Sequence, residues 1–414
     1  MKPLKVLCIM LLFGGILCGL PSSVWPQLVL GQYEDEAPFR TWNTFGFSTA
    51  AALGRGETVF ALAADCAASL TNPALLSWLP KITVAVNGSF NFASFYKYSF
   101  VNTGVLYSKE NIPHGFYALD FAGLSFRLQN WTLAFTAAAT ECYTRPPAIA
   151  EYKSGGILYY KIDLRQTGIL RNINFSISRK IGSRLSAGLG LNFLSGTFEK
   201  KYVERWELPT EVITDRKSHD FQGFFLNGGL YFHLSDKFQA AAVFRTPFSR
   251  KAKSQSYLNY NAPAGHTDIT IAASADSTYT HPLVLGLGAC YIFSPDVCLA
   301  ADLTYFNWSS YSVKYFGETL PRNFKDVVKV GVGIEYKSSF RLFSQNIDTP
   351  IRFGLVYDPQ PMKEPCSSYY YLSFGSAFQW KHFSIDIGTL LGKERGSGNN
   401  LSARKVALSI NFHL

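Results

Sequence analysis

The last nine residues of the chain, 406–414, read VALSINFHL. Apolar side chains alternate there with small or polar ones, and the two sets are Val406, Leu408, Ile410, Phe412 and Leu414 against Ala407, Ser409, Asn411 and His413. A two-residue period of this length predicts a β-strand with one face against an apolar medium. Such a strand is typical of a membrane β-barrel, whose lipid-facing apolar residues alternate with lumen-facing polar ones.

The same alternation recurs upstream, for example over residues 173–178, 185–193 and 224–234. We therefore predict an all-β fold, an outer-membrane antiparallel β-barrel of about 14 strands. The expected strands are 81–92, 116–127, 131–142, 167–180, 184–200, 221–235, 237–250, 281–293, 297–310, 325–337, 349–358, 368–380, 382–393 and 403–414. The connections alternate between long and short, as in barrels with long outer loops and short periplasmic turns. The alternative, a soluble β-sandwich, would have shorter strands.

Composition argues against a helical membrane protein. Of the 414 residues 47% are hydrophobic, yet no run of about 20 apolar residues lies beyond the N-terminus. Aromatic residues make up 15% of the chain and charged residues 16%. Both values suit a barrel with aromatic girdles and a lipid-facing wall.

The N-terminus predicts export. Lys2 and Lys5 precede an apolar run at 6–17 that is too short to cross a bilayer, so we expect a signal peptide over residues 1–31. Export together with a barrel places the mature protein in a bacterial outer membrane. The barrel assembly machinery, which reads a terminal amphipathic strand, is then an expected partner.

The net charge of +10 and the cysteines define further expectations. Basic residues scatter through predicted loops, which favours outer-membrane lipid and lipopolysaccharide over nucleic acid as partners. The run 250–253, Arg-Lys-Ala-Lys, suits lipopolysaccharide phosphates or a carboxylate ligand. No Cys-x-x-Cys pair occurs, so we expect no metal and no cofactor. Cys290 and Cys298 flank a predicted turn, and whether they pair stays open.

One segment does not follow the strand pattern. Residues 42–80 are rich in Ala and Gly, and the part near 59–70 suits a helix. Because the segment precedes the first strand, we expect residues 32–80 to form an N-terminal extension and a plug, or hatch, inside the lumen. The barrel then spans residues 81–414.

The hatch segment resembles the FadL family of outer-membrane transporters for fatty acids and aromatic hydrocarbons. The resemblance rests on an ordered set of short motifs, Leu53-Gly54-Arg55-Gly56, Ala64-Asp65 and Asn72-Pro73-Ala74-Leu75. Later stretches also resemble the family, at 302–309, 323–336 and 352–361. The third predicted strand, 131–142, contains no Gly, although the family often bends this strand to open a side gap.

The resemblance implies a diffusion channel for hydrophobic compounds such as long-chain fatty acids or aromatic hydrocarbons. Ligand is captured at the outer loops and leaves sideways, through the barrel wall near the third strand. The implied hatch and gating residues are Gly54, Arg55, Gly56, Asp65, Asn72, Pro73 and Ala74, and the aromatic residues expected at the capture site or in a lipid-interface belt are Phe92, Phe95, Tyr96, Tyr98 and Phe100.

Individual roles follow from chemistry. Arg55 is expected to pair with Asp65 or with a lumen carboxylate, because an unpaired charge inside a barrel is costly. The turn at 72–74 either gates the exit or only anchors the hatch.

Two other classes compete with a channel. An enzyme is disfavoured because no Gly-x-Ser-x-Gly motif occurs and the seven His residues are scattered, so no catalytic residues are assigned. A FadL-like barrel can instead act as a protein-secretion adaptor that holds a cargo protein. The hatch motifs do not separate these two uses of the fold.

Overall fold

The computed structural model of the chain describes residues 45–62, 65–101, 104–113, 119–207, 210–320, 323–342, 345–364, 366–396 and 402–414. The predicted signal peptide lies outside these residues, and so does the predicted extension before Phe45. No helix among the described residues is long and apolar enough to cross a membrane.

The described chain consists of three short helices in the hatch, one 3-10 turn, and strands. The helices are α2 (Ala50–Gly54), η2 (Cys66–Leu70), η3 (Pro73–Trp78) and η4 (Trp308–Ser310). The strands are β1 (Ile82–Val101), β2 (Gly104–Pro113), β3 (Leu119–Leu128), β4 (Trp131–Cys142), β5 (Arg145–Ser154), β6 (Ile157–Ile181), β7 (Leu185–Glu207), β8 (Thr210–His233), β9 (Phe238–Arg245), β10 (Phe248–Asn261), β11 (Ile269–His281), β12 (Val284–Ser294), β13 (Val297–Phe306), β14 (Ser312–Tyr315), β15 (Glu318–Leu320), β16 (Val327–Tyr336), β17 (Ser339–Leu342), β18 (Gln345–Asp348), β19 (Ile351–Pro359), β20 (Ser368–Trp380), β21 (Phe383–Arg395) and β22 (Ser402–His413).

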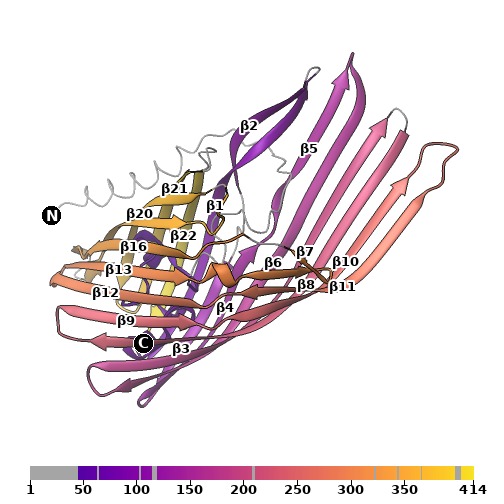
Figure 1. Cartoon of the computed structure of the whole chain (residues 1–414). Coiled ribbons are helices and arrows are strands. Elements are labelled where there is room, and N and C mark those ends of the chain that lie inside the picture. Colours follow the sequence, from indigo (N-terminus) through magenta and orange to yellow (C-terminus); the bar gives the residue numbers. More distant parts are fainter. Residues whose placement is uncertain are drawn as a thin grey trace.

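Antiparallel pairing closes these strands into a barrel, as Figure 1 shows. The wall has 14 strands in the order β1, β3, β4, β6, β7, β8, β9, β12, β13, β16, β19, β20, β21 and β22. The first and last strands close the ring, with Thr83 opposite His413 and Ala93 opposite Ala403. The predicted fold class is therefore confirmed, and each predicted strand overlaps one strand of the wall.

The two faces of the wall differ as the alternation predicts. Outward positions carry exposed apolar side chains, such as Phe135, Phe175, Leu191, Phe353, Leu355, Leu372 and Ile410. Inward positions carry buried small or polar side chains, such as Thr136, Asn174, Asn192, Ser373, Ser409 and Asn411. Among the described residues, a closed antiparallel wall with a band of exposed apolar side chains suits a lipid bilayer, because strand pairing satisfies most of its backbone polar groups.

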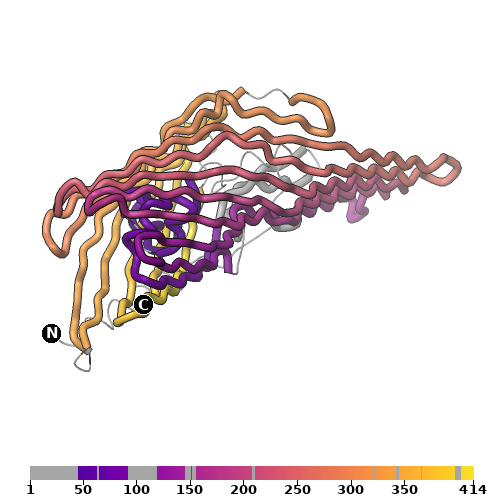
Figure 2. Tube along the Cα trace, turned by 90° about the horizontal axis from the view of Figure 1, so that it is seen from below, coloured from indigo at the N-terminus to yellow at the C-terminus, as the bar shows by residue number. Residues whose placement is uncertain are grey.

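The hatch, residues 45–80 as far as they are described, lies inside the ring (Figure 2). Nearly all of its side chains are buried, and α2 packs against β20 and β21 while η3 packs against β6, β7 and β8. Its short helices are separated by irregular turns. Of the predicted helix near 59–70, the described residues form η2, which Asp65 caps at its start.

One side of the barrel continues far beyond the other. Strands β6, β7, β8, β10 and β11 extend past the ring as a projecting sheet (Figure 1). The sequence places loops at 143–166, 201–220 and 251–280, yet paired strands occupy most of these ranges. The reason is that outward side chains above the lipid band are polar, so the apolar-polar alternation disappears while the ladder continues.

Candidate functional site

The backbone of the hatch lies in direct contact with the barrel wall. The Ala50 amide donates to Asn87 Oδ1 at 3.2 Å and to Ser409 Oγ at 2.9 Å. A Cβ on Gly54 would lie 2.6 Å from Gly375 Cα, so α2 reaches this distance only because both positions are glycine. Gly54 therefore allows α2 to lie directly against the backbone of β20.

Gly56 allows the hatch backbone to turn next to the wall. Its φ of +66° is the left-handed region that glycine adopts readily. Its amide donates to Ser373 Oγ at 2.9 Å, and a Cβ there would lie 2.4 Å from Val332 O. The hatch therefore turns sharply at Gly56 while touching β16 and β20.

Arg55 connects the hatch to a row of buried charges on the wall. Its Nη1 donates to Glu335 Oε2 at 2.8 Å, and Arg352 Nε donates to the same oxygen at 2.7 Å. Arg352 also contacts Asp386 at 2.7 Å. Of the two partners predicted for Arg55, the structure selects the lumen carboxylate. We call Arg55, Glu335, Arg352 and Asp386 the hatch ion cluster.

Asp65 does not pair with Arg55. Its Oδ2 accepts from Thr49 Oγ at 2.7 Å, and its Oδ1 accepts from the Ala67 amide at 2.7 Å. Asp65 therefore caps η2 and ties two parts of the hatch together, a structural arrangement inside the plug.

The turn at 72–74 fixes the hatch to the opposite side of the lumen. Asn72 Nδ2 donates to Phe60 O at 2.7 Å and to Leu230 O at 3.4 Å, and its Oδ1 accepts from the Ala74 amide at 3.1 Å. Pro73 begins η3, where its missing N–H is harmless. Ser178 and Ser186 donate to Ala74 O. The turn thus rests on β6, β7 and β8.

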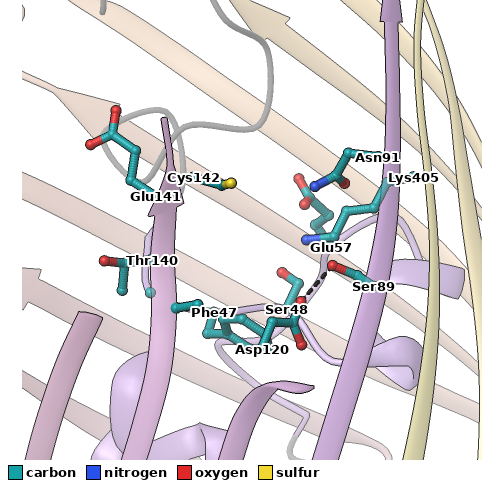
Figure 3. A pocket seen from close by; sticks show the side chains of 12 residues that line it. Phe47, Ser48, Glu57, Ser89, Asn91, Asp120, Thr140, Glu141, Cys142 and Lys405 are labelled. Atoms are coloured by element: carbon teal, nitrogen blue, oxygen red, sulfur yellow. Dashed lines mark hydrogen bonds between the residues drawn. The ribbon is translucent and has the colours of Figure 1, made fainter. Parts of the chain in front are cut away.

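A cavity of about 70 Å³ lies beside the third strand of the wall (Figure 3). It is lined by Gly46, Phe47, Ser48, Glu57, Ser89, Asn91, Asp120, Ala139, Thr140, Glu141, Cys142 and Lys405. These come from the hatch, β1, β3, β4 and β22. The lining joins the edge of the plug to the part of the wall where the FadL resemblance places a side opening.

The wall is irregular at the same place. The ladder between β3 and β4 ends at the pair Phe121 and Ala138, in the described residues. Between Ala139 and Glu141 the register of β4 against β6 shifts by a bulge. The third strand is thus bent without a glycine, since a bulge adds a residue and turns the strand locally. We call the gap in pairing above Ala138 the β3–β4 seam.

The charged groups around the cavity have partners. Asp120 accepts hydrogen bonds from Asn87 Nδ2 at 2.7 Å and from Ser89 Oγ. Glu141 accepts from Arg250 Nη1 at 3.0 Å and from Tyr143 Oη at 2.8 Å. A space of this size suits a few water molecules and is too small for an acyl chain.

The position of Arg250 differs from what was expected for the basic run 250–253. Its guanidinium points into the lumen and lies 4.6 Å and 4.7 Å from the rings of Phe221 and Tyr279. The idea that the whole run 250–253 meets lipopolysaccharide is wrong for Arg250, because strand alternation leaves only Lys251 and Lys253 exposed on the outer face. No local sequence pattern links Asp120 to Asn87 and Ser89, or Glu141 to Arg250, because these partners lie far away in the chain.

The five aromatic residues predicted at the capture site lie on β1, in the range 92–100, where the backbone pairs with β2. Their side chains lie outside the described part of the structure, so their role stays a prediction.

Sequence reasoning missed an apolar patch on the lumen-side face of the projecting sheet, formed by Leu258, Ile269 and Ile271, which are 37%, 52% and 55% exposed. Beside it, Tyr260 Oη donates to Glu211 Oε2 at 2.7 Å, and this hydrogen bond raises the pKa of the phenol.

Comparison with known proteins gives a consistent result for the fold. A family model described as BamG matches residues 63–368. A FadL homologue of Pseudomonas aeruginosa superposes with a TM-score of 0.63 at 14% identity, covering 89% of this chain and 99% of that one. The toluene transporter TodX of Pseudomonas putida gives 0.62 at 14% identity, covering 90% and 99%. The toluene transporter TbuX of Ralstonia pickettii gives 0.59 at 14%, covering 89% and 99%. A search of curated proteins found no match.

Proposed function

Because this chain belongs to the BamG family and has the fold of the FadL homologue and the toluene transporters, we propose that it is an outer-membrane diffusion channel for hydrophobic compounds. Long-chain fatty acids and aromatic hydrocarbons are the substrate classes. The observation that carries the proposal is a hatch-filled barrel in which, among the described residues, β4 has a bulge and the β3–β4 ladder ends next to a cavity at the edge of the hatch.

The physics favours a side exit over a straight pore. An acyl chain gains about 0.8 kcal/mol per CH₂ removed from water, so it does not pass a wet lumen readily. The buried polar rows on the inner wall make the lumen of this barrel unsuitable for such a chain. A route that leads from the outer mouth to the seam and into the bilayer keeps the ligand in apolar surroundings for most of its path.

Capture at the outer side rests on apolar surface above the mouth. We assign this surface to the aromatic residues predicted at 92–100, which lie on the β1–β2 hairpin. No covalent chemistry is required, and we propose no catalytic residue and no cofactor.

Opening of the seam requires the hatch edge to move. Phe47 and Ser48 line the cavity, and Phe47 stacks on Phe121 with ring centroids 5.2 Å apart. The turn at 72–74 lies against β6–β8, which favours an anchoring role for Asn72, Pro73 and Ala74 over direct gating.

Contact with lipopolysaccharide is proposed on the outer face of the wall. Arg171 and Lys251 are exposed, and Ser195 and Gln222 separate them in one cross-strand row. The row stands above exposed Phe193 and its neighbours on the lipid band. Cations immediately above an apolar band suit the phosphates of an outer-leaflet glycolipid.

The test of the proposal is uptake. Cells that lack their own transporter are supplied with labelled oleate and labelled toluene, with and without this protein. We expect uptake several-fold above the vector control. Deleting residues 72–74 separates the two roles of the turn, since unchanged uptake by a folded deletion variant removes the gating role. Uptake at the vector level by the correctly inserted full chain would refute the channel.

The second candidate is a barrel that holds a protein. Two observations favour it, namely the family name BamG, which hints at a relation to the barrel assembly machinery, and the sheet that projects beyond the mouth. Co-purification of a secreted or barrel protein, together with no binding of oleate by the purified chain, would support this use over the channel.

A further inference from the structure

The projecting sheet ends at β11, and one side of this strand is open. On its other side β11 pairs with β10 from the pair Phe248 and His281 to the pair Tyr260 and Ile269, without a bulge. On the open side its pairing, in the described residues, is limited to β14, opposite Thr278, Tyr279 and Thr280. Figures 1 and 2 show the β10–β11 hairpin at the far margin of the sheet.

We call the space beside the open edge of β11 the lane. β14 occupies the end of this space next to Thr278–Thr280. The chain then turns away from β11 at Phe316 and Gly317, which have φ values of 50° and 85°. The turn leads into β15, which pairs with β14 and not with β11. Above this turn the lane beside Ile269–Ser277 holds no described strand, and at ~3.3 Å per residue it is about 30 Å long.

The open edge lacks the usual protection. Natural edge strands carry Lys, Pro, a bulge or a cover that prevents pairing with other chains. Residues 269–277 read ITIAASADS, with no Lys and no Pro and with Asp276 as their one charge. Side chains 269–274 are exposed without interruption. Every second residue points its N–H and C=O into the lane, where no described strand pairs with them.

The lane has two chemically different faces. On the lumen side Ile269 and Ile271 continue the apolar patch through their cross-strand partners Tyr260 and Leu258. On the outer side stand Thr270, Ser274 and Asp276, which are polar and exposed. An occupant must therefore be extended, apolar on alternate residues and polar between them. An extended β-strand has this pattern, whereas the surface of a folded domain does not.

A second copy of this chain does not satisfy the edge. Two copies in one membrane are related by rotation about the membrane normal, so equivalent strands run in the same sense in both. β11 pairs antiparallel with β10 and with β14, and a parallel copy would break this pattern. Because no described segment of this chain pairs with Ile269–Ser277 on the open side, we infer that the occupant comes from another polypeptide that reaches the outer mouth.

We propose that the open edge of β11, residues 269–277, binds an extended segment of a partner protein by strand addition, with its apolar side chains on the patch of Leu258, Ile269 and Ile271. This site is separate from the seam, so it goes beyond the channel and can fail or hold independently of it. The main chain of β11 supplies affinity, and the patch selects alternating apolar residues.

The probe is a capped eight-residue peptide of alternating Val and Thr with a fluorophore, titrated onto the full-length protein in detergent. A second peptide carries N-methyl groups on alternate amides, which keeps its side chains and removes its backbone donors. The test variant is Ser274→Lys, on the edge strand. Its matched control is Gln255→Lys, because Gln255 is the cross-strand partner of Ser274 on β10 and both side chains are exposed.

We expect saturable binding by fluorescence anisotropy, at least 10-fold weaker for the methylated peptide. Ser274→Lys should weaken binding at least 10-fold, and Gln255→Lys should change it less than twofold. Equal binding of both peptides, equal effects of both lysines, or no binding at 1 mM peptide would each overturn strand addition. Oleate uptake by Ser274→Lys should equal that of the parent chain, which distinguishes failure of this site from failure of the channel.

Discussion

We predict that Arg55, as a member of the hatch ion cluster, makes a measurable contribution to the free energy of unfolding of the barrel. In Arg55→Met the side chain keeps much of its volume and loses its charge. The charge-assisted hydrogen bond to Glu335, 2.8 Å long, disappears, and such bonds contribute about 1.5–3 kcal/mol. A carboxylate left wholly unpaired would cost about 3–5 kcal/mol.

Glu335 is not left alone, because Arg352 Nε remains 2.7 Å from the same oxygen. We therefore expect the free energy of unfolding to fall by about 2 kcal/mol, within the range for one charged hydrogen bond. The assay is urea unfolding in detergent micelles followed by tryptophan fluorescence. Trp78 reports on the hatch, since it lies beneath Lys180 Nζ at 3.9 Å and 5.2 Å from the ring of Tyr231.

The matched control is Arg165→Met. Arg165 also pairs with a carboxylate, Asp163, at 3.0 Å, but its side chain is 63% exposed. Exposed pairs contribute about 0–1 kcal/mol, so this variant should unfold almost as the parent chain does. If Arg55→Met costs no more than Arg165→Met, the cluster does not hold the hatch and the reasoning fails.

Three further outcomes are expected. Gly54→Ala should lose the heat-resistant folded band on gels, because its Cβ would lie 2.6 Å from Gly375 Cα, whereas Gly223→Ala, with its nearest contact at 3.4 Å, should keep the band. Asn72→Ala should lower the free energy of unfolding by about 1–3 kcal/mol, since it orphans the buried Phe60 carbonyl, and equal stability in urea would contradict this. Cys290 and Cys298 are diagonal neighbours, because Cys290 lies opposite Ala300 and Cys298 opposite Ile292, and Cα atoms of diagonal neighbours are about 7–8 Å apart, beyond the usual span of a disulfide; diamide should therefore leave the mass of the folded chain unchanged, and a loss of about 2 Da at this pair by mass spectrometry would contradict this.

The wall could be read from the sequence because the bilayer imposes one simple rule. Where lipid touches the strand, as at Phe175 or Leu408, apolar side chains must recur every second residue. The predicted strands therefore fall on the wall of the barrel. Above the lipid band water replaces the bilayer, the rule no longer applies, and strands such as 201–220 are read as loops.

The hatch could be located but not explained from the sequence. Gly54, Gly56 and Asn72 mark places of close approach or turning, and the structure shows the backbone contacts at each. The partner Glu335 lies 280 residues away from Arg55, and no local pattern selects it. The form of the β3–β4 seam was not predicted from the sequence. The third strand is bent by a bulge at 139–141 and not by a glycine.

Strand alternation also determines which side of the wall Tyr369, Tyr370 and Tyr371 face. All three suit an aromatic girdle, yet Tyr369 and Tyr371 are buried on the lumen side and only Tyr370 faces outward, 53% exposed. Strand alternation requires this outcome for any three consecutive residues, so composition alone overestimates a girdle.

The measurement that tests side exit most directly is oleate uptake by a chain whose β3–β4 seam can be closed at will. Asp120→Cys with Ala139→Cys, in a background with Cys142→Ser, joins the next pair beyond the last one in the ladder. We predict that oxidised cells take up labelled oleate at the vector level and that a reductant restores the parent rate. Undiminished uptake with the bridge shown to be formed would contradict passage through the seam.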